Sequence, residues 1–454
     1  MVKLDAKDRK QYAQHIIHTL EKEDYMQFRD TFMELHPTDQ IEIFHSLGKA
    51  QRSAIYYYLS PEEFSDIFGR LEFEMQKDII LELNEQYSSE MFNSMPADNA
   101  AYFLQEIPDD KANEILDKMD QTEASEIKEL LSYPAETAGA IMTKEVYRIS
   151  AADTASNVID KLRKEPPDAE TIYYLYAVDE YEKLVGVLSL RELITANENE
   201  HIEKIMSTRA VSVEVFMDQE EVASLIQKYD FLAVPVVSKN KTLLGIITVD
   251  DVMDVMEEEA TEDFGEISAA KGATDVNVGA LAAARKRAPW IILLMLFGLL
   301  TAEVIGYFEE TLEAIVLLAA FIPLIMDAAG NVGTQSLAVS VRGLALGTIQ
   351  KSSLGRMIRR EFATGLILGL TCMIVLGVTI NLFYKGNAML AFIVGISIFI
   401  TLSISTIIGA TVPLIINKFK LDPAIASGPF ITTINDIIGL LIYFSIATTL
   451  LDYL

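Results

Sequence analysis

Cysteine is almost absent from this sequence: Cys372 is the only one, and it lies in an apolar run. A single thiol excludes a disulfide framework and any metal site built from several cysteines. The N-terminal stretch MVKLDAKDRKQY lacks the apolar core of a signal peptide, so we expect the front of the chain to stay in the cytoplasm. The sequence also lacks a Gly-x-x-x-x-Gly-Lys-(Ser/Thr) loop, which argues against a pump driven by ATP hydrolysis.

Basic residues are scarce in the first 284 positions, where 26 Lys and Arg stand against 57 Asp and Glu, a net charge of −31. The rest of the chain is nearly neutral, with 11 basic and 9 acidic residues. An acidic field of this size repels nucleic acid and attracts cations. We therefore expect divalent cations, and no nucleic acid, among the partners; solubility alone is the other interpretation.

Residues 1–135 have a helical pattern, and short units in them begin alike. Each unit starts with Pro, continues with acids and then places apolar residues at helical spacing, a start signal for helices. Several short helices of this kind predict an acidic, all-α, superhelical N-terminal domain over residues 1–135. The units are HPTDQIEIFHSL (36–47), SPEEFSDIFGRL (60–71), MPADNAAYFLQEI (95–107) and PDDKANEILDKM (108–119).

Residues 136–256 contain a second repeat. IMTKEVYRIS (141–150) matches IMSTRAVSVE (205–214), and GVLSLREL (186–193) matches GIITVDDV (245–252). The alternation of apolar runs predicts β-α-β-β-α in each copy. The pair resembles tandem CBS domains, an α/β regulatory module that often binds adenine nucleotides.

A hydroxyl and a carboxylate stand one turn apart at the end of each copy, as Ser189 with Glu192 and Thr248 with Asp251. Such a pair at a helix start can hold a ribose or phosphate group. N-capping of the helix by Ser189 and Thr248 explains the same pattern, and both interpretations stay open.

The stretch DDVMDVMEEEATEDFGE (250–266) has nine acids and no basic residue. On a helix, Asp251, Asp254, Glu258 and Glu262 share one face, where like charges oppose helix formation. Bound Mg²⁺ or Ca²⁺, which prefer oxygen ligands, would offset this repulsion; a solvated acidic helix is the alternative. We assign residues 257–284 to an acidic linking helix.

Residues 285–454 predict a transmembrane domain, because their apolar runs are long enough to cross a bilayer. Basic residues gather before the first span, between the second and third, and between the fourth and fifth, and this side should be cytoplasmic. The C-terminus then lies outside. The five predicted spans are 288–308, 313–340, 362–384, 388–416 and 427–451, with the second interrupted near 327–331.

Asp436 stands out because it lies inside the last apolar run, FITTINDIIGLLIYF (430–444), with Thr432 one turn before it. A carboxylate at the centre of a bilayer costs roughly 2.5–3.5 kcal/mol and usually faces water, a partner or an ion. A cation in a wet pore would keep it charged; a hydrogen-bonded structural Asp and a proton relay are the alternatives. AAGNVGTQ (328–335) predicts either unwound backbone, with Gly330 and Asn331 at mid-membrane depth, or close helix packing through Gly330 and Gly333. Asp327 either caps a helix after the break or contributes to the pore.

The whole chain resembles the MgtE family of CBS-domain magnesium channels and transporters, most specifically in PLIMDAAGNVGTQSLAVSVRG (323–343) and DPAIASGPFITTINDIIGLLIY (422–443). The resemblance implies a homodimer in the plasma membrane with a central pore at which Asp436 appears twice. It implies a nucleotide site for ATP through Tyr174, Arg191 and Phe231. Asp327 stands where a small residue is common in the family, and Asp66 where a longer Glu can occur. The sensor acids that it implies are Asp66, Asp98, Asp218, Glu220, Asp230, Asp251, Asp254, Glu259, Glu262, Asp263 and Asp422.

The function predicted from these features is a Mg²⁺-selective channel or transporter gated by cytosolic Mg²⁺. Asp436, Thr432, Asn331 and Gly330 would bind the ion in the pore, mostly through its waters, since Mg²⁺ dehydrates reluctantly. The alternative is a CBS-regulated secondary transporter coupled to another ion. An intramembrane aspartyl protease is disfavoured, because Asp436 lacks a Gly-x-Gly-Asp setting, and we expect no enzyme activity.

Overall fold

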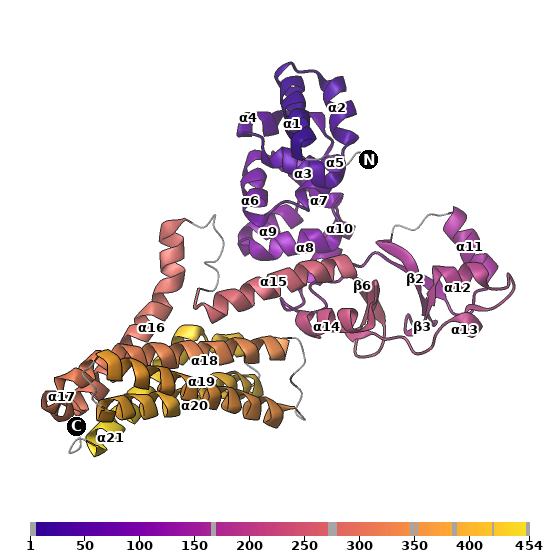
Figure 1. Cartoon of the computed structure of the whole chain (residues 1–454). Coiled ribbons are helices and arrows are strands. Elements are labelled where there is room, and N and C mark those ends of the chain that lie inside the picture. The colour runs from indigo at the N-terminus through magenta and orange to yellow at the C-terminus, as the bar shows by residue number, and fades with distance from the viewer. Residues whose placement is uncertain are drawn as a thin grey trace. The chain divides into compact units, whose positions relative to one another are not determined.

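The computed structural model describes residues 6–164, 169–270, 279–345, 349, 353–383, 388–419 and 422–450 of the chain (Figure 1). Lys351, Lys385 and Lys420, which lie in the predicted loops between spans, and the C-terminal residues 451–454 lie outside these residues. The chain forms two compact units, Met1–Val255 and Met256–Leu454, which are described separately.

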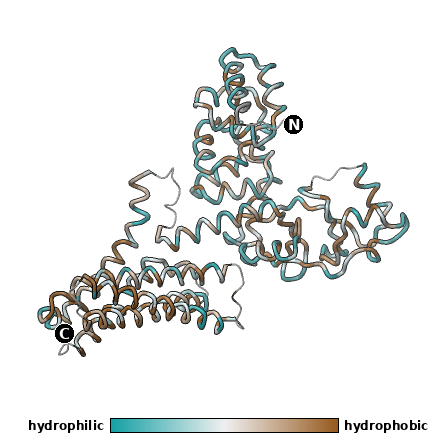
Figure 2. Tube along the Cα trace, in the orientation of Figure 1, coloured by the Kyte–Doolittle hydropathy of each residue, from teal (hydrophilic) through white to brown (hydrophobic). Residues whose placement is uncertain are grey.

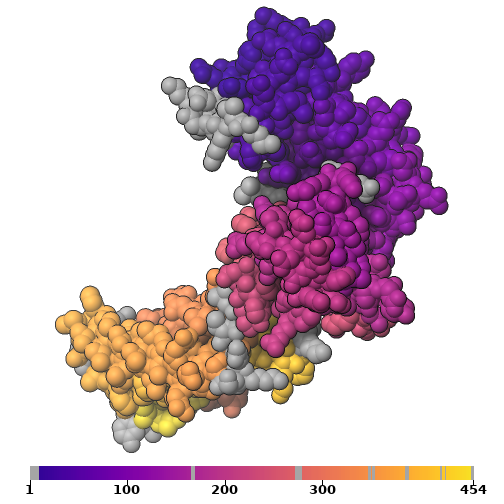
Figure 3. Space-filling view, turned by 90° about the vertical axis from the view of Figure 1, so that its right-hand side faces the viewer, coloured from indigo at the N-terminus to yellow at the C-terminus, as the bar shows by residue number. Residues whose placement is uncertain are grey.

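The first unit begins with a domain made entirely of helices, as the sequence predicted. Figure 3 shows the surface of this helical domain in indigo and purple. Its helices are α1 (Ala6–Glu21), α2 (Tyr25–Met33), α3 (Pro37–His45), α4 (Lys49–Tyr58), α5 (Pro61–Phe68), α6 (Phe73–Glu82), α7 (Glu85–Asn93), α8 (Ala97–Glu106), α9 (Asp109–Leu116) and α10 (Gln121–Leu131).

The start signals of these helices act as expected. Ser60 caps α5, its hydroxyl accepting from the Glu63 backbone N–H at 3.2 Å while the Glu63 carboxylate accepts from the Ser60 N–H at 2.9 Å. Pro61 then occupies the first turn, where its missing N–H costs nothing. Fully buried aromatic rings run through the domain and hold the short helices together: Phe28, Phe32, Phe44, Phe64, Phe68, Phe92 and Phe103.

Two small sheets follow, ordered β1-β2-β3 and β4-β5-β6, each with one parallel and one antiparallel pairing. Both repeats therefore have the predicted β-α-β-β-α order. The elements are β1 (Val146–Ser150), α11 (Ala155–Lys164), β2 (Thr171–Val178), β3 (Leu184–Ser189), α12 (Leu190–Thr195), α13 (Ile202–Ile205), β4 (Val213–Glu214), α14 (Gln219–Tyr229), β5 (Ala233–Val237), β6 (Leu243–Thr248) and α15 (Val249–Ile267).

The two repeats exchange their leading segments. Thr143 of the first copy bridges Ile246 on β6 of the second, and Ser207 of the second copy bridges Val187 on β3 of the first. Each glycine beside these bridges lets the arm approach: a Cβ on Gly245 would lie 2.3 Å from the Thr143 carbonyl oxygen. The IM(T/S) segment of each copy therefore lies against the G-x-x-(S/T) strand of the other copy, which explains why both sequences occur twice.

The second unit is a bundle of long apolar helices, brown over much of their length in Figure 2. Five helical segments of the described chain are long and apolar enough to cross a membrane. The elements are α16 (Ala280–Tyr307), α17 (Glu309–Ala314), η1 (Val316–Phe321), α18 (Ile322–Ala345), α19 (Leu354–Phe383), α20 (Ala388–Lys418), η2 (Pro423–Ile425) and α21 (Gly428–Thr449).

The predicted interruption of the second span at 327–331 is wrong. α18 runs unbroken from Ile322 to Ala345, and the irregular turn lies earlier, in the 3₁₀ helix η1. Asp327 is therefore inside α18 and caps no helix. The glycines of α18 are contact points: a Cβ on Gly409 of α20 would lie 2.1 Å from the carbonyl oxygen of Gly333, so a side chain there would separate the helices.

The acidic helix also differs from its predicted bounds of 257–284. α15 starts at Val249, directly after β6, and continues to Ile267 across the boundary between the two units. Residues 271–278 of the expected linking segment lie outside the described chain. The basic residues at 285–287 belong to α16, which begins at Ala280.

Candidate functional site

The predicted pore residues lie where α18 and α21 cross. A Cβ on Gly330 would be 3.0 Å from Thr432 Cγ2, so the two helices are in close contact at this point. The Thr432 hydroxyl donates to the Pro429 carbonyl oxygen at 2.8 Å, within its own helix. Asp436 is half-buried one turn further along α21, and Asp327 is near enough for the two carboxylates to interact.

Asn331 and Asp327 lie one turn apart on α18, and both are exposed in a single chain. Of the four predicted pore residues, the structure brings Gly330 and Thr432 into contact. It leaves Asn331 on the open side of the bundle. Sequence reasoning gave Asp327 as either a helix cap or a contributor to the pore. It could not select between these, because the approach of Asp327 to Asp436 depends on the crossing of two helices far apart in the chain.

Asn435, next to Asp436, is a polar residue that the sequence reasoning did not select. Its amide is fully buried against Gly333, and neither its Oδ1 nor its Nδ2 has a hydrogen-bond partner among the described residues. A buried amide of this kind is usually satisfied by a water molecule. Its position inside a motif with Asp436 was the only sequence signal for it.

A first group of acidic side chains surrounds Asp98 of α8. Burial raises the pKa of Asp98 to about 7, against the lowering effect of a hydrogen bond from the Asn99 N–H, and the charges of Asp251, Glu145 and Glu170 raise it further. Burial and Asp251 also raise the pKa of Glu170. The helical domain and both CBS copies thus contribute acids to one region of the first unit.

The pKa of Asp251, another member of this group, is also raised. Burial raises its pKa, while hydrogen bonds from the Thr248 hydroxyl (2.5 Å) and backbone N–H (3.3 Å) lower it, and Asp250 and Asp254 raise it again. Net negative charge of this density favours a cation. Within the described residues no three His, Cys, Asp or Glu side chains are arranged as the ligands of one metal ion.

A second acidic group, in the second unit, joins α15 to the loop before α21. Burial raises the pKa of Asp263 to about 6, and the charges of Asp422 and Glu262 add to this, whereas Arg342 at the end of α18 opposes it. Asp422 caps η2 by accepting from the Ala424 N–H at 2.8 Å. The two acids implied by the family resemblance, Asp263 and Asp422, are therefore neighbours.

The end of α15 packs close to the start of the helix that carries Asp436. Ile267 packs against a buried cluster that includes Leu337, Val341 and Ile431. A Cβ on Gly428, the first residue of α21, would lie 3.3 Å from the Ile267 carbonyl oxygen. A shift of α15 in this unit would therefore disturb the start of α21.

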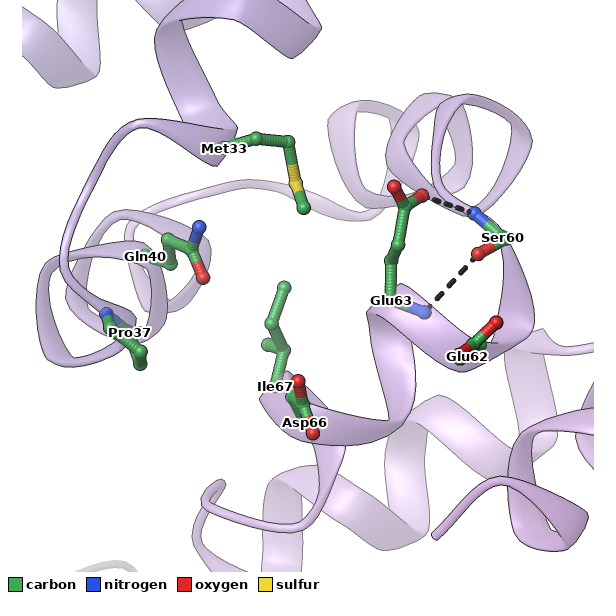
Figure 4. Close-up of a pocket in the computed structure, with 8 residues that line it drawn as sticks. All are labelled: Met33, Pro37, Gln40, Ser60, Glu62, Glu63, Asp66 and Ile67. Atoms are coloured by element: carbon green, nitrogen blue, oxygen red, sulfur yellow. Dashed lines mark hydrogen bonds between the residues drawn. The ribbon is translucent and has the colours of Figure 1, made fainter. Parts of the chain in front are cut away.

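Asp66 of α5 lines a cavity of about 400 Å³ in the helical domain, together with Met33, Gln40 and Glu62 (Figure 4). Glu63, on the same wall, is bound by the Arg29 guanidinium, which holds the pKa of that carboxyl down at about 2. Glu63 therefore already has a cationic partner.

The predicted sensor acids of the second CBS copy are at opposite ends of one helix. Asp218 caps α14 and accepts from the Glu220 N–H at 2.9 Å, whereas Asp230 ends the helix in a left-handed conformation with φ of 55°. An α-helix of this length spans roughly 15 Å. Asp230 therefore cannot join Asp218 and Glu220 around one ion within a single chain. Glu259 lies on α15 in the second unit.

The predicted nucleotide residues also have structural roles in this conformation. Ser189 caps α12, because its hydroxyl accepts from the Glu192 backbone N–H, so the N-capping explanation holds for Ser189. The Thr248 hydroxyl donates to the Asp251 carboxylate instead. Tyr174 on β2 pairs with Ser189 on β3, and the Phe231 ring is stacked on Tyr229 at 5.4 Å. Arg191 is exposed on α12.

Models of three protein families match this chain. The MgtE model, described as a divalent cation transporter, matches residues 322–446. The model of the MgtE intracellular N domain matches 35–136, and that of the CBS domain matches 138–199 and 202–258. A magnesium transporter MgtE of Enterococcus faecalis is 44% identical over 444 residues, which are 96% of this chain and 97% of the relative. That of Bacillus subtilis is 44% identical over 328 residues, 72% of each chain.

Two solved structures resemble the first part of the chain. The soluble part of a magnesium transporter is 41% identical, with a TM-score of 0.53, and covers 56% of this chain and 99% of its own. The cytosolic domain of the Mg²⁺ channel MgtE in complex with ATP is 34% identical, with a TM-score of 0.51, and covers 54% and 99%. The named relatives are transporters and not enzymes, and the predicted fold class and family are confirmed. The chain therefore belongs to the MgtE family of magnesium transporters.

Proposed function

We propose that this protein is a Mg²⁺-selective channel of the plasma membrane that closes when Mg²⁺ binds to its cytosolic part. Asp436 is the observation that carries the pore: it is a half-buried carboxylate two turns into a candidate membrane span, beside a second acid, Asp327. Two carboxylates at such a place attract a divalent cation. Mg²⁺ keeps most of its waters, so these groups, Thr432, Asn331 and the Gly330 carbonyl would bind it through hydrogen bonds to water.

The pore is completed by a second copy of the chain. Asp327 and Asn331 are at least partly exposed on α18 in the single chain, and a charged and an amide side chain facing lipid would be costly. A homodimer that joins these faces encloses them and places two Asp436 carboxylates at one pore. The N-terminal domains lie in the cytoplasm and the C-terminus outside.

Gating uses the acids of α15, which begins in the first unit and ends in the second. Without metal, the Asp98 group and the Asp263 group each concentrate negative charge, which loosens the contacts that carry them. Bound Mg²⁺ neutralises the acids, draws α15 against its neighbours and fixes the start of α21 through Ile267 and Gly428. Several weak sites shift such an equilibrium steeply when each prefers the closed state.

ATP binds at the CBS pair, a proposal supported by the ATP complex of the related cytosolic domain. Tyr174, Arg191 and Phe231 would contact the base and phosphates. Ser189 and Thr248 would contact the ribose only after exchanging their present hydrogen bonds to Glu192 and Asp251.

A second candidate is a secondary transporter of divalent cations coupled to protons. The position of Asp436 inside a candidate span favours it, because carboxylates within membrane segments mark proton pathways as well as ion pathways. Mg²⁺ flux that requires a pH gradient, and shows no single-channel steps, would select this function.

Patch recording of the purified full-length protein, with Mg²⁺ varied on the cytosolic side, tests the channel proposal. We expect unitary currents carried by Mg²⁺ that disappear at millimolar cytosolic Mg²⁺. A chain that starts after about residue 275 should conduct without this inhibition, since it lacks α15 and therefore the acids that this helix contributes to the Asp98 group and the Asp263 group. Inhibition that persists in the truncated protein would locate the sensor in the membrane unit.

A further inference from the structure

Glu361 of α19 is a buried carboxylate in a helix long and apolar enough to cross the membrane, and no part of the account above uses it. Its side chain lies among the packed helices of the second unit, and the residue is only 5% exposed. The Ser336 hydroxyl of α18 donates to its Oε2 at 2.9 Å. Arg360 donates to its Oε1 through Nη2 at 2.8 Å and Nε at 3.2 Å.

The two partners of Glu361 differ in kind. The Arg360 side chain is 62% exposed and is the neighbour in sequence, so it balances the charge without tying one helix to another. Ser336 is buried and belongs to a different helix. The Ser336–Glu361 bond is therefore a dry connection between α18 and α19, and bonds to a charged acceptor are the stronger class.

Glycine brings α18 close to two other helices at this level. Gly333 meets Asn435 of α21 on one side and Gly409 of α20 on another, at distances that leave no space for a side chain. Glycine allows helices to approach, but it provides no side chain that resists rotation of α18 about its axis. Two buried hydroxyls further along α18 provide that resistance: Ser336 through Glu361 at 2.9 Å, and Ser340 through a longer bond to the Ala410 carbonyl oxygen of α20 at 3.3 Å. Of the two, only the Ser336 bond has a charged acceptor.

Rotation of α18 bears directly on the pore. Side chains extend to a radius of about 5–6 Å from a helix axis, so a rotation of about 20° moves them by roughly 2 Å. A movement of this size would change the spacing of Gly330 and Asn331 relative to Thr432 and Asp436. Discrimination between Mg²⁺ and the larger Ca²⁺ depends on the size of the site and the number of its ligands.

We propose that Glu361 is a positioning residue for ion selection: through Ser336 it fixes the rotation of α18 and so the geometry of the Gly330–Thr432 crossing. The inference rests on the proposed transport of Mg²⁺. An amide retains a carbonyl oxygen that can accept from Ser336, and Arg360 can turn into water. Glu361→Gln therefore keeps the connection, whereas Glu361→Ala and Ser336→Ala remove it.

The first test measures Mg²⁺ and Ca²⁺ flux into proteoliposomes with the full-length protein. Glu361→Ala and Ser336→Ala should lower the Mg²⁺/Ca²⁺ flux ratio about tenfold, the effect of one lost bond to a charged group if all of it reaches the pore. Glu361→Gln should restore the ratio to that of the parent. The matched control is Ser397→Ala, because Ser397 is also buried and its hydroxyl donates to the Ile393 carbonyl oxygen of its own helix.

The second test reads the geometry without transport and so separates this inference from the proposed function. A Cβ on Gly330 would lie 3.2 Å from Thr432 Cβ. The Cβ atoms of a disulfide are about 3.5–4.5 Å apart, so a small separation of the two helices allows a disulfide between Gly330→Cys and Thr432→Cys in a Cys372→Ser background. Oxidation should cross-link this pair readily, more slowly with Glu361→Ala or Ser336→Ala, and normally with Glu361→Gln or Ser397→Ala. The inference would be overturned if Glu361→Ala left the cross-linking rate unchanged. It would also be overturned if Glu361→Gln slowed cross-linking as much as Glu361→Ala does. If the cysteine pair cross-links as expected but the parent protein carries no Mg²⁺, the proposed function is refuted and the positioning role of Glu361 stays supported.

Discussion

Replacing Asp98 by Asn should stabilise the cytosolic part of the protein when no metal is present. The pKa of Asp98 lies at about 7 in the folded protein, raised by burial and by Asp251, Glu145 and Glu170. The ordinary value is 3.8. Between these two values the folded state holds the proton more tightly than the unfolded state. The stability of the metal-free fold therefore falls as pH rises from about 4 to 7.

The size of the effect follows from the pKa difference. Each pKa unit corresponds to about 1.4 kcal/mol, so ionised Asp98 costs up to about 4 kcal/mol at pH 8. The amide of the Asp98→Asn protein carries no charge and avoids most of this cost, while the hydrogen bond from the Asn99 N–H to a carboxylate is lost. We expect a gain of about 2–4 kcal/mol at pH 8, equivalent to roughly 4–16 °C in melting temperature. At pH 4 the two proteins should melt nearly together.

Mg²⁺ should stabilise the parent more than it stabilises the Asp98→Asn protein. A ligand at a hundred times its Kd stabilises the fold by about 2.7 kcal/mol, and Asp98→Asn should lose much of this gain. Thermal melting of residues 1–270 at pH 5 and pH 8, with EDTA or MgCl₂, measures both effects; a related soluble part was crystallised alone. Asp78→Asn, which neutralises another acid of the same domain, is the control. A metal-free Asp98→Asn protein that melts below the parent at pH 8, or that responds to Mg²⁺ as the parent does, would refute the reasoning.

Three further changes test other parts of the account. Gly409→Ala places a Cβ 2.1 Å from the Gly333 carbonyl oxygen and should destabilise the membrane unit by about 1–3 kcal/mol in detergent melting, whereas Gly377→Ala, with open space around it, should not. Ser60→Ala removes the cap of α5 and should cost about 1 kcal/mol in chemical denaturation, more than Ser53→Ala on the exposed face of α4. Neutralising Asp251, Asp254 and Glu259 together should weaken the protection that Mg²⁺ gives against protease and leave the channel open at Mg²⁺ levels that close the parent; closure at unchanged Mg²⁺ would show that these acids are not the sensor.

The sequence contained most of the fold because the relevant signals are local. Proline with Ser60 and Glu63 marks the start of α5, and strand-helix alternation marks the CBS repeats. The interruption expected at 327–331 failed because glycine and asparagine were interpreted as local helix breakers. In the bundle, Gly330 and Gly333 remain helical since their missing side chains make space for Thr432 and Asn435.

The candidate sites were less predictable, because their members come together only in the folded chain. Asp98 meets acids about 50 to 150 positions away, and neither Glu145 nor Glu170 carried a local signal. Glu361 was hidden for a different reason. It directly follows Arg359 and Arg360, so its charge looked like part of a solvent-facing basic loop, although its side chain is buried against Ser336.

The most direct test of the central claim is Mg²⁺ current through the full-length protein with Asp436→Asn. The substitution keeps the shape of the side chain and removes the charge that the account holds responsible for concentrating the cation. We predict a correctly folded protein, with parent-like melting, whose Mg²⁺ conductance is strongly reduced, and Asp436→Ala should abolish it. Equal conductance of the Asp436→Asn protein and the parent would contradict the account and assign Asp436 a structural role.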